Sequence, residues 1–107
     1  MTDDFYAASE WKSSFKVLSP GSEWPKPSGI PLWITNVSFA VRPDSEEDFI
    51  GILIVRSWDG TFTLCKLFPH QPSQEMNVFW NAIQHIVFYN SGNREITISY
   101  SYKSQSD

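Results

Sequence analysis

The chain has 107 residues, 41% of them hydrophobic and 16% aromatic, so we expect one compact domain over residues 1–107 with a substantial core. Twelve acidic against eight basic side chains give a net charge of −4, and no cluster of Lys or Arg is suited to following a phosphate backbone, which disfavours nucleic-acid binding. The acidic start of the chain does not resemble a signal peptide, and no apolar run is long enough to cross a bilayer, so we expect a cytoplasmic protein without a membrane partner.

The first strand is predicted near residues 11–18. Apolar Trp11, Phe15 and Val17 alternate there with polar side chains at the two-residue period of a strand. Before this strand, Thr2 or Asp3 is placed to cap a short helical turn that runs through Ala8.

Residues 19–31 are predicted to form a loop, because four prolines and two glycines in this segment disfavour regular strand pairing. Trp24 lies among these prolines and has two possible places. It either folds back onto the core or points outward from a rigid segment, where it would be a contact for a partner. We therefore keep Trp24 as a candidate partner-binding residue.

Residues 32–41 are predicted to form the next strand, with Trp33, Thr35 and Val37 on its inner face. An acidic run follows at 44–48. It does not match a calcium loop, because Phe49 replaces the glycine at the sixth position and Val55 the glutamate at the twelfth. The run is either a solvated loop or a docking surface for a basic partner protein. The candidate binding residues here are Asp44, Glu46, Glu47 and Asp48.

The segment from Phe49 to Phe68 is predicted to be an antiparallel hairpin closed by a type I′ turn at Asp59-Gly60. Its first strand is apolar on both faces, which is typical of a central strand. With a two-residue turn, Trp58 would pair with Thr61. Arg56 and Trp58 lie at the turn end and are further candidate contacts for a partner.

Cys65 is the one cysteine, and with His70 or His85 it is the only candidate for a nucleophile and base pair. We interpret Cys65 as a buried packing residue in mid-strand. The histidines are too few for a zinc site, and no catalytic or phosphate-binding motif is present. The sequence therefore predicts no enzyme activity, no metal and no cofactor.

A helix is predicted over residues 73–85, because Met76, Phe79, Trp80 and Ile83 recur at three- and four-residue spacing after Ser73 as a cap. A fifth strand is expected after it. The turn residues at 90–93 then suggest a C-terminal hairpin, and the final strand is followed by a frayed tail at 103–107.

These elements predict an α+β fold: a mainly antiparallel sheet of five or six strands with a central meander and one principal helix on one face. Surplus aromatics fit a Trp-rich core better than an exposed aromatic surface. The predicted function is recognition or inhibition of another protein, with immunity and anti-defence proteins as analogues in size and charge alone. Two alternatives stay open: a small-ligand module or pocket enzyme with an aromatic-lined cavity, and a self-associating subunit such as a homodimer joined at a sheet edge.

Overall fold

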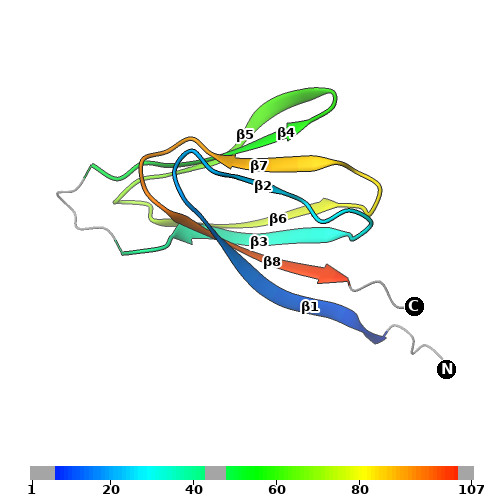
Figure 1. Cartoon of the computed structure of the whole chain (residues 1–107). Coiled ribbons are helices and arrows are strands. Elements are labelled where there is room, and N and C mark those ends of the chain that lie inside the picture. The colour runs from blue at the N-terminus through cyan, green and yellow to red at the C-terminus, as the bar shows by residue number, and fades with distance from the viewer. Residues whose placement is uncertain (1–6, 43–47, 104–107) are drawn as a thin grey trace.

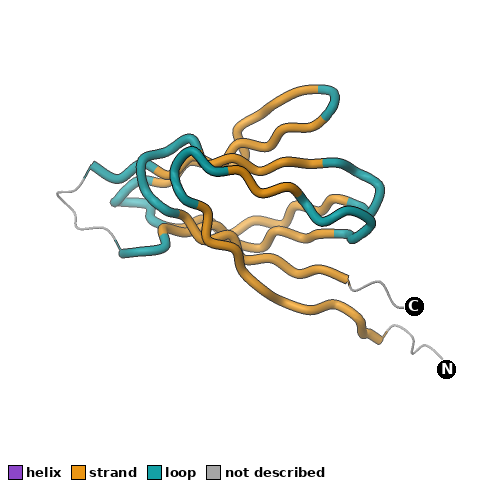
Figure 2. Tube along the Cα trace, viewed as in Figure 1, coloured by secondary structure: helices purple, strands orange, loops and turns teal. Residues whose placement is uncertain are grey.

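The computed structural model describes residues 7–42 and 48–103, and side chains from residue 11 onward. Those residues form eight strands and no helix (Figures 1 and 2). The strands are β1 (Ala7–Leu18), β2 (Glu23–Pro25), β3 (Leu32–Phe39), β4 (Gly51–Ser57), β5 (Gly60–Leu67), β6 (Ser73–Trp80), β7 (Ile86–Asn90) and β8 (Ile96–Lys103). The predicted α+β class is therefore wrong, because the described chain is all-β.

The strands form two antiparallel sheets with the orders β1-β8-β3-β6 and β2-β7-β4-β5. Figure 1 shows these sheets as two layers. The single sheet with a central meander was a wrong prediction, since the consecutive strands β3 and β4 belong to different layers. The C-terminal hairpin was also wrong, because β7 and β8 lie in different sheets.

Strand β6 replaces the predicted helix at 73–85. Met76 and Val78 are partly buried and Trp80 is buried, whereas Asn77 and Phe79 between them are exposed. This is the two-residue alternation of a strand, and the helical spacing of Met76, Phe79 and Trp80 was coincidental. Pairing of β6 with β3 along its length decides the conformation.

Strand β3 contains an irregularity that reverses part of its predicted inner face. Pairing shifts between Ile34 and Asn36 against both neighbouring strands. Relative to β8, Thr35 is an extra residue of the kind that defines a β-bulge, whereas relative to β3 it is β6 that has the extra residue. Before the bulge the inward side chains are Leu32 and Ile34, and after it they are Val37 and Phe39. The predicted inward positions of Trp33 and Thr35 are therefore wrong, and both residues are exposed.

The predicted hairpin exists as β4 and β5, and β4 is an interior strand of its sheet as expected. The turn itself differs. Ser57 pairs with Gly60, which puts Trp58 and Asp59 in the turn and gives Gly60 a φ of +152°. Arg56 consequently pairs with Thr61, so the predicted register of Trp58 opposite Thr61 is displaced.

The segment at 19–31 is only partly a loop. Its residues Glu23–Pro25 form β2, which pairs with β7 despite the neighbouring prolines. Lys26 follows and is buried, with Nζ donating hydrogen bonds to the carbonyls of Pro27 (3.1 Å) and Ile30 (2.8 Å). Burial lowers the pKa of Lys26. These bonds fix the path from β2 to β3.

The core lies between the two layers and is apolar apart from Lys26 and Asn90. Its largest fully buried side chains are those of Phe88, Leu32, Ile34, Leu53, Leu67, Ile96, Ile98, Val37, Val55 and Asn90. The Asn90 amide donates to the carbonyls of Leu18 and Arg94, both at 2.9 Å, and accepts from the Gly92 amide. Its polar groups are thus satisfied where three segments meet. A helix long and apolar enough to span a membrane is absent from the described residues.

Candidate binding surfaces

An exposed aromatic cluster covers part of the outer side of the β1-β8-β3-β6 sheet. Ring centroids of Trp11 and Trp33 lie 5.7 Å apart, and those of Trp33 and Phe79 also lie 5.7 Å apart, both in edge-to-face geometry. The exposed fraction ranges from 36% for Trp33 to 48% for Phe79, and Phe15 on β1 reaches 65%. We call Trp11, Phe15, Trp33 and Phe79 the aromatic face.

The strand pairing explains how this cluster forms. Trp33 pairs with Phe79 on one side and with Ser101 on the other, and Ser101 pairs with Ser13. Strands β1 and β6 are the two edges of the sheet, which at the usual spacing lie about 14 Å apart. The Trp11 and Phe79 rings nevertheless approach to 6.4 Å. They lean toward each other across β8 and β3, and the small side chains of Ser99 and Ser101 on β8 leave room for this.

The aromatic face is held in place but not covered. Trp33 Nε1 donates a hydrogen bond to Asn77 Oδ1 on β6, which fixes the orientation of the indole. Within the described residues, both sheets have their buried side chains between the layers, and the aromatic face lies on the outside. A cluster of exposed aromatic rings on a sheet face marks a surface suited to binding another protein.

A second exposed apolar group lies at one end of the other sheet. Trp58 in the β4–β5 turn is 90% exposed, Ile83 in the β6–β7 connection is 83% exposed, and Phe62 on β5 is half exposed. All three line one pocket of about 390 Å³, together with Trp80 and His85 among others. We call Trp58, Phe62 and Ile83 the hairpin tip.

The predicted contact residues Arg56 and Trp58 lie together at this end, where both line a neighbouring pocket. Arg56 forms an ion pair with Glu23 of β2, so the guanidinium ties two strands of one sheet. Of the two places considered for Trp24, the structure shows the one in which it folds back onto the core. Its partly buried ring lies 5.2 Å from that of Phe88 and 5.0 Å from that of Tyr100. Trp24 therefore packs against the core instead of projecting as a separate contact.

The predicted acidic contacts lie elsewhere. Asp44, Glu46 and Glu47 fall outside the described residues, and Asp48 is exposed. Its carbonyl accepts a hydrogen bond from Asn93 Nδ2, next to the start of β4. Since Trp58 follows the other end of this seven-residue strand, Asp48 and Trp58 are separated by roughly 20 Å and do not form one site.

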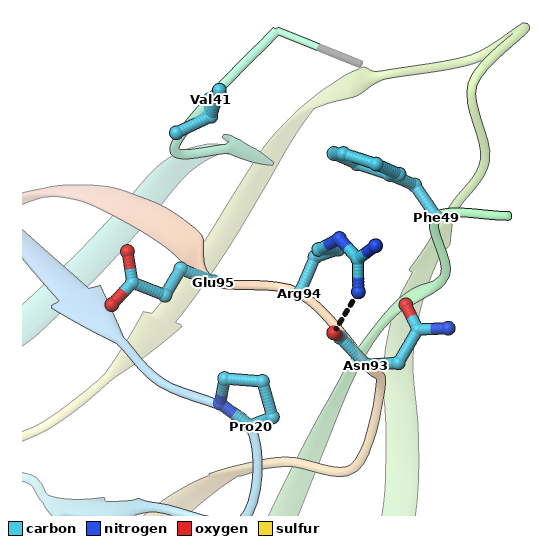
Figure 3. A pocket seen from close by; sticks show the side chains of 6 residues that line it. All are labelled: Pro20, Val41, Phe49, Asn93, Arg94 and Glu95. Carbon is cyan, nitrogen blue, oxygen red and sulfur yellow. Dashed lines mark hydrogen bonds between the residues drawn. The ribbon is translucent and has the colours of Figure 1, made fainter. Parts of the chain in front are cut away.

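A surface pocket of about 400 Å³ lies near Asp48 (Figure 3). It is lined by Pro20, Val41, Phe49, Asn93, Arg94 and Glu95. The Arg94 guanidinium carbon lies 4.4 Å from the centre of the Phe49 ring, a cation–π contact, and Glu95 accepts a hydrogen bond from Ser19. One aromatic ring, that of Phe49, lines this pocket, whereas the pocket beside the hairpin tip is lined by the rings of Trp58, Phe62 and Trp80.

Cys65 is buried, and burial raises the pKa of its thiol to about 11. His70 stacks on Phe68 with ring centroids 5.6 Å apart, and His85 is exposed at the hairpin tip end. Among the described residues, no three His, Cys, Asp or Glu side chains gather in a way that could hold a metal ion. The arrangement gives Cys65 the environment of a packing residue.

The thiol of Cys65 is therefore expected to react slowly in the native protein. A pKa raised from 9.0 to about 11 lowers the thiolate fraction roughly 100-fold at neutral pH, and burial restricts access further. Ellman's reagent added to native protein should show a rate at least tenfold below that of protein unfolded in urea. Equal rates in the two states would contradict this description of Cys65.

The aromatic face was missed by the sequence analysis. Trp33 was placed inward because the bulge at Thr35 was not foreseen, and Phe79 was assigned to a helix. The surplus of aromatic residues was the available signal. It was interpreted as a core, although an exposed aromatic surface was the other alternative.

Comparison with known proteins identifies the fold. No family model and no curated protein sequence matches this chain. Among solved structures, the nucleoplasmin-like N-terminal domain of Drosophila FKBP39 matches with a TM-score of 0.73 and 11% identity, covering 94% of this chain and 95% of that one. The Drosophila NLP core, whose structure was described as giving insight into pentamer formation and histone binding, matches with a TM-score of 0.64 and 10% identity, over 90% and 100% of the two chains. The chain thus has a nucleoplasmin-like β fold. The analogy with immunity and anti-defence proteins gains no support from these matches.

Proposed function

We propose that this chain is a self-associating β-sandwich subunit that assembles with further copies of itself through the aromatic face and binds other proteins in the assembled form. The observation that carries the proposal is the aromatic face itself. Four large rings lie exposed on one sheet face, with three of them already in mutual contact. Burying such rings against another copy would remove them from water, and aromatic residues contribute strongly to interfaces.

The fold supports assembly beyond a dimer. One protein with this fold, the Drosophila NLP core, is described in terms of pentamer formation, and the present chain spans its full length. The predicted homodimer through a sheet edge is less suitable. Edge strand β1 has exposed Lys12 and Lys16, and lysine on an edge opposes pairing with a second edge. A closed ring through side-chain contacts avoids this.

The protein partner proposed here is a basic one. The chain has a net charge of −4, and four of its twelve carboxylates fall within the five residues at 44–48. Concentrated acidic charge accelerates association with a basic partner more than it increases final affinity. The structure of the NLP core was described in terms of histone binding, and histones are likewise basic proteins. The proposal involves no catalytic step.

The oligomeric state tests the proposal. Native mass spectrometry and sedimentation should show the wild-type chain as an assembly larger than a dimer. The double variant Trp11→Ser, Phe15→Ser should be monomeric, because both side chains are exposed on β1 and their loss weakens the interface more than the fold.

The matched control is Val41→Ser, which removes an exposed apolar side chain (66% exposed) away from the aromatic face and should leave the assembly intact. Circular dichroism establishes that each variant is folded. A wild-type chain that stays monomeric at every accessible concentration would reject the proposed function.

A further inference from the structure

We infer that the surface that docks on the aromatic face is the hairpin tip of the next copy, so that each subunit contributes two different patches to a closed ring. This inference rests on the proposed self-association and names the second half of its interface. It is carried by Trp58, Phe62 and Ile83, whose exposure the fold of a single chain does not explain.

A ring requires two unlike surfaces on every subunit. In a head-to-tail contact the patch on one copy meets a different patch on its neighbour, whereas a patch that meets itself produces a dimer and stops there. The aromatic face belongs to the β1-β8-β3-β6 sheet, and the hairpin tip belongs to the β4–β5 hairpin and the β6–β7 connection. Trp58 and Phe62 lie on the other layer from the aromatic face, and Ile83 lies in the connection between the layers. The two patches share no residue, so one copy can use both at the same time.

The hairpin tip has the form of an inserting group. Trp58 is 90% exposed in a two-residue turn, and among the described residues no aromatic ring packs against it. Exposed Trp side chains of this kind are frequent hot spots of protein interfaces. Ile83 and Phe62 surround the same pocket beside Trp58 and extend the apolar contact.

The aromatic face offers what such an indole needs. Its rings already pair edge-to-face at 5.7 Å, and a further ring fits the same geometry. A buried indole N–H also requires an acceptor. The hydroxyls of Ser13 and Ser101, which lie 3.4 Å apart between Phe15 and Trp33 in the sheet, provide one.

Charge complements this contact at its edge. Asp59 follows Trp58 in the turn and is exposed, and Lys103 lies opposite Trp11 in the strand pairing and is also exposed. Docking of the tip brings an acidic residue toward a basic one. Two aromatic faces packed on each other would instead bring Lys103 into the contact twice and would leave Trp58 in water.

Mixing two variants tests the inference. The face variant Trp11→Ser, Phe15→Ser retains only the tip, and the tip variant Trp58→Ser, Ile83→Ser retains only the face. Each should be monomeric alone. An equimolar mixture should form a 1:1 heterodimer that grows no further, because one intact face meets one intact tip and the remaining surfaces are disabled. Native mass spectrometry distinguishes the two variants by mass.

The failures are distinguishable. A tip variant that keeps the wild-type mass would overturn this inference and leave the proposed self-association standing. Two monomeric variants that form no heterodimer when mixed would likewise overturn it. A monomeric wild type would reject both proposals together. Circular dichroism of each variant establishes that it is folded. Mixing the face variant with Val41→Ser, which has both an intact tip and an intact face, establishes that the proteins are competent to associate.

Discussion

Replacing Phe88 with alanine is expected to lower the free energy of unfolding by about 3–5 kcal/mol. Phe88 is fully buried in β7, an interior strand of its sheet. Its ring stacks on that of Trp24 at 5.2 Å and meets that of Trp80 edge-to-face at 5.4 Å. Alanine would leave a cavity between the two indoles and remove both ring contacts. Urea unfolding followed by circular dichroism measures the loss.

Two further substitutions calibrate this expectation. Phe88→Leu keeps most of the volume and should cost less than about 1.5 kcal/mol, and Phe62→Ala, at a half-exposed position, should cost less than about 1 kcal/mol. All three belong in the monomeric Trp11→Ser, Phe15→Ser background, where self-association does not add to stability. Comparable losses for Phe62→Ala and Phe88→Ala would mean that Phe88 is not the packing centre described here.

Local patterns in the sequence predicted the strands whose signal is complete within a few residues. The alternation after Trp11 marked β1, although the strand begins already at Ala7. The apolar run and the turn residues near Asp59 marked β4 and β5, but the turn and the pairing register were displaced, with a further shift between Leu53 and Ile54. The helical turn predicted through Ala8 was wrong at Ala7 and Ala8, which belong to β1, and the frayed tail predicted at 103–107 was wrong at Lys103, which belongs to β8. The remaining residues of these two predictions lie outside the described part of the chain.

The β6 segment shows why a periodic pattern can mislead. Met76, Phe79, Trp80 and Ile83 match a helix, but Met76, Val78 and Trp80 match a strand equally well. The two patterns compete over eight residues, and pairing with β3, some 40 residues away in sequence, decides between them. Such long-range pairing is not readable from a local window. For the same reason the sequence could not divide the strands between two sheets.

The candidate site depended on one residue of register. The bulge at Thr35 breaks the two-residue alternation, so with Val37 and Phe39 inward the residues before it that face inward are Leu32 and Ile34, and Trp33 is on the surface. Nothing in the sequence around Thr35 marks the bulge. Trp58 was predicted to pair with Thr61 beside the turn and instead lies in the turn, exposed, and its role in binding stays a prediction. The aromatic face could not be predicted without the register of β3.

Replacing Gly92 with alanine is expected to lower the free energy of unfolding by about 3 kcal/mol, because the fold leaves no space for a side chain at this position. A Cβ atom at this position would lie 2.1 Å from the carbonyl oxygen of Ile50 and 2.9 Å from the Cα of Gly51. Both are backbone atoms, which cannot move away by a change of rotamer as a side chain can. The loop would have to move away from the start of β4, where hydrogen bonds of 3.0 Å from Ser91 to Ile52 and 2.8 Å from Asn93 to Ile50 hold it. Each such bond contributes about 0.5–1.5 kcal/mol, and strain adds to their loss.

Gly21 is the matched control, because a side chain there is restricted by the backbone conformation and not by neighbouring atoms. It has a φ of +80° and no atom within 4 Å of an added Cβ, so Gly21→Ala meets only the conformational penalty of about 1–2 kcal/mol. Urea unfolding of the two variants in the monomeric background should therefore rank Gly92→Ala as the more damaging. The reverse order would show that the close approach of Gly92 to Ile50 does not hold the β7–β8 loop against β4. With that contact loosened, the Asn93 bonds to Ile50 and Asp48 would no longer fix the chain that enters β4.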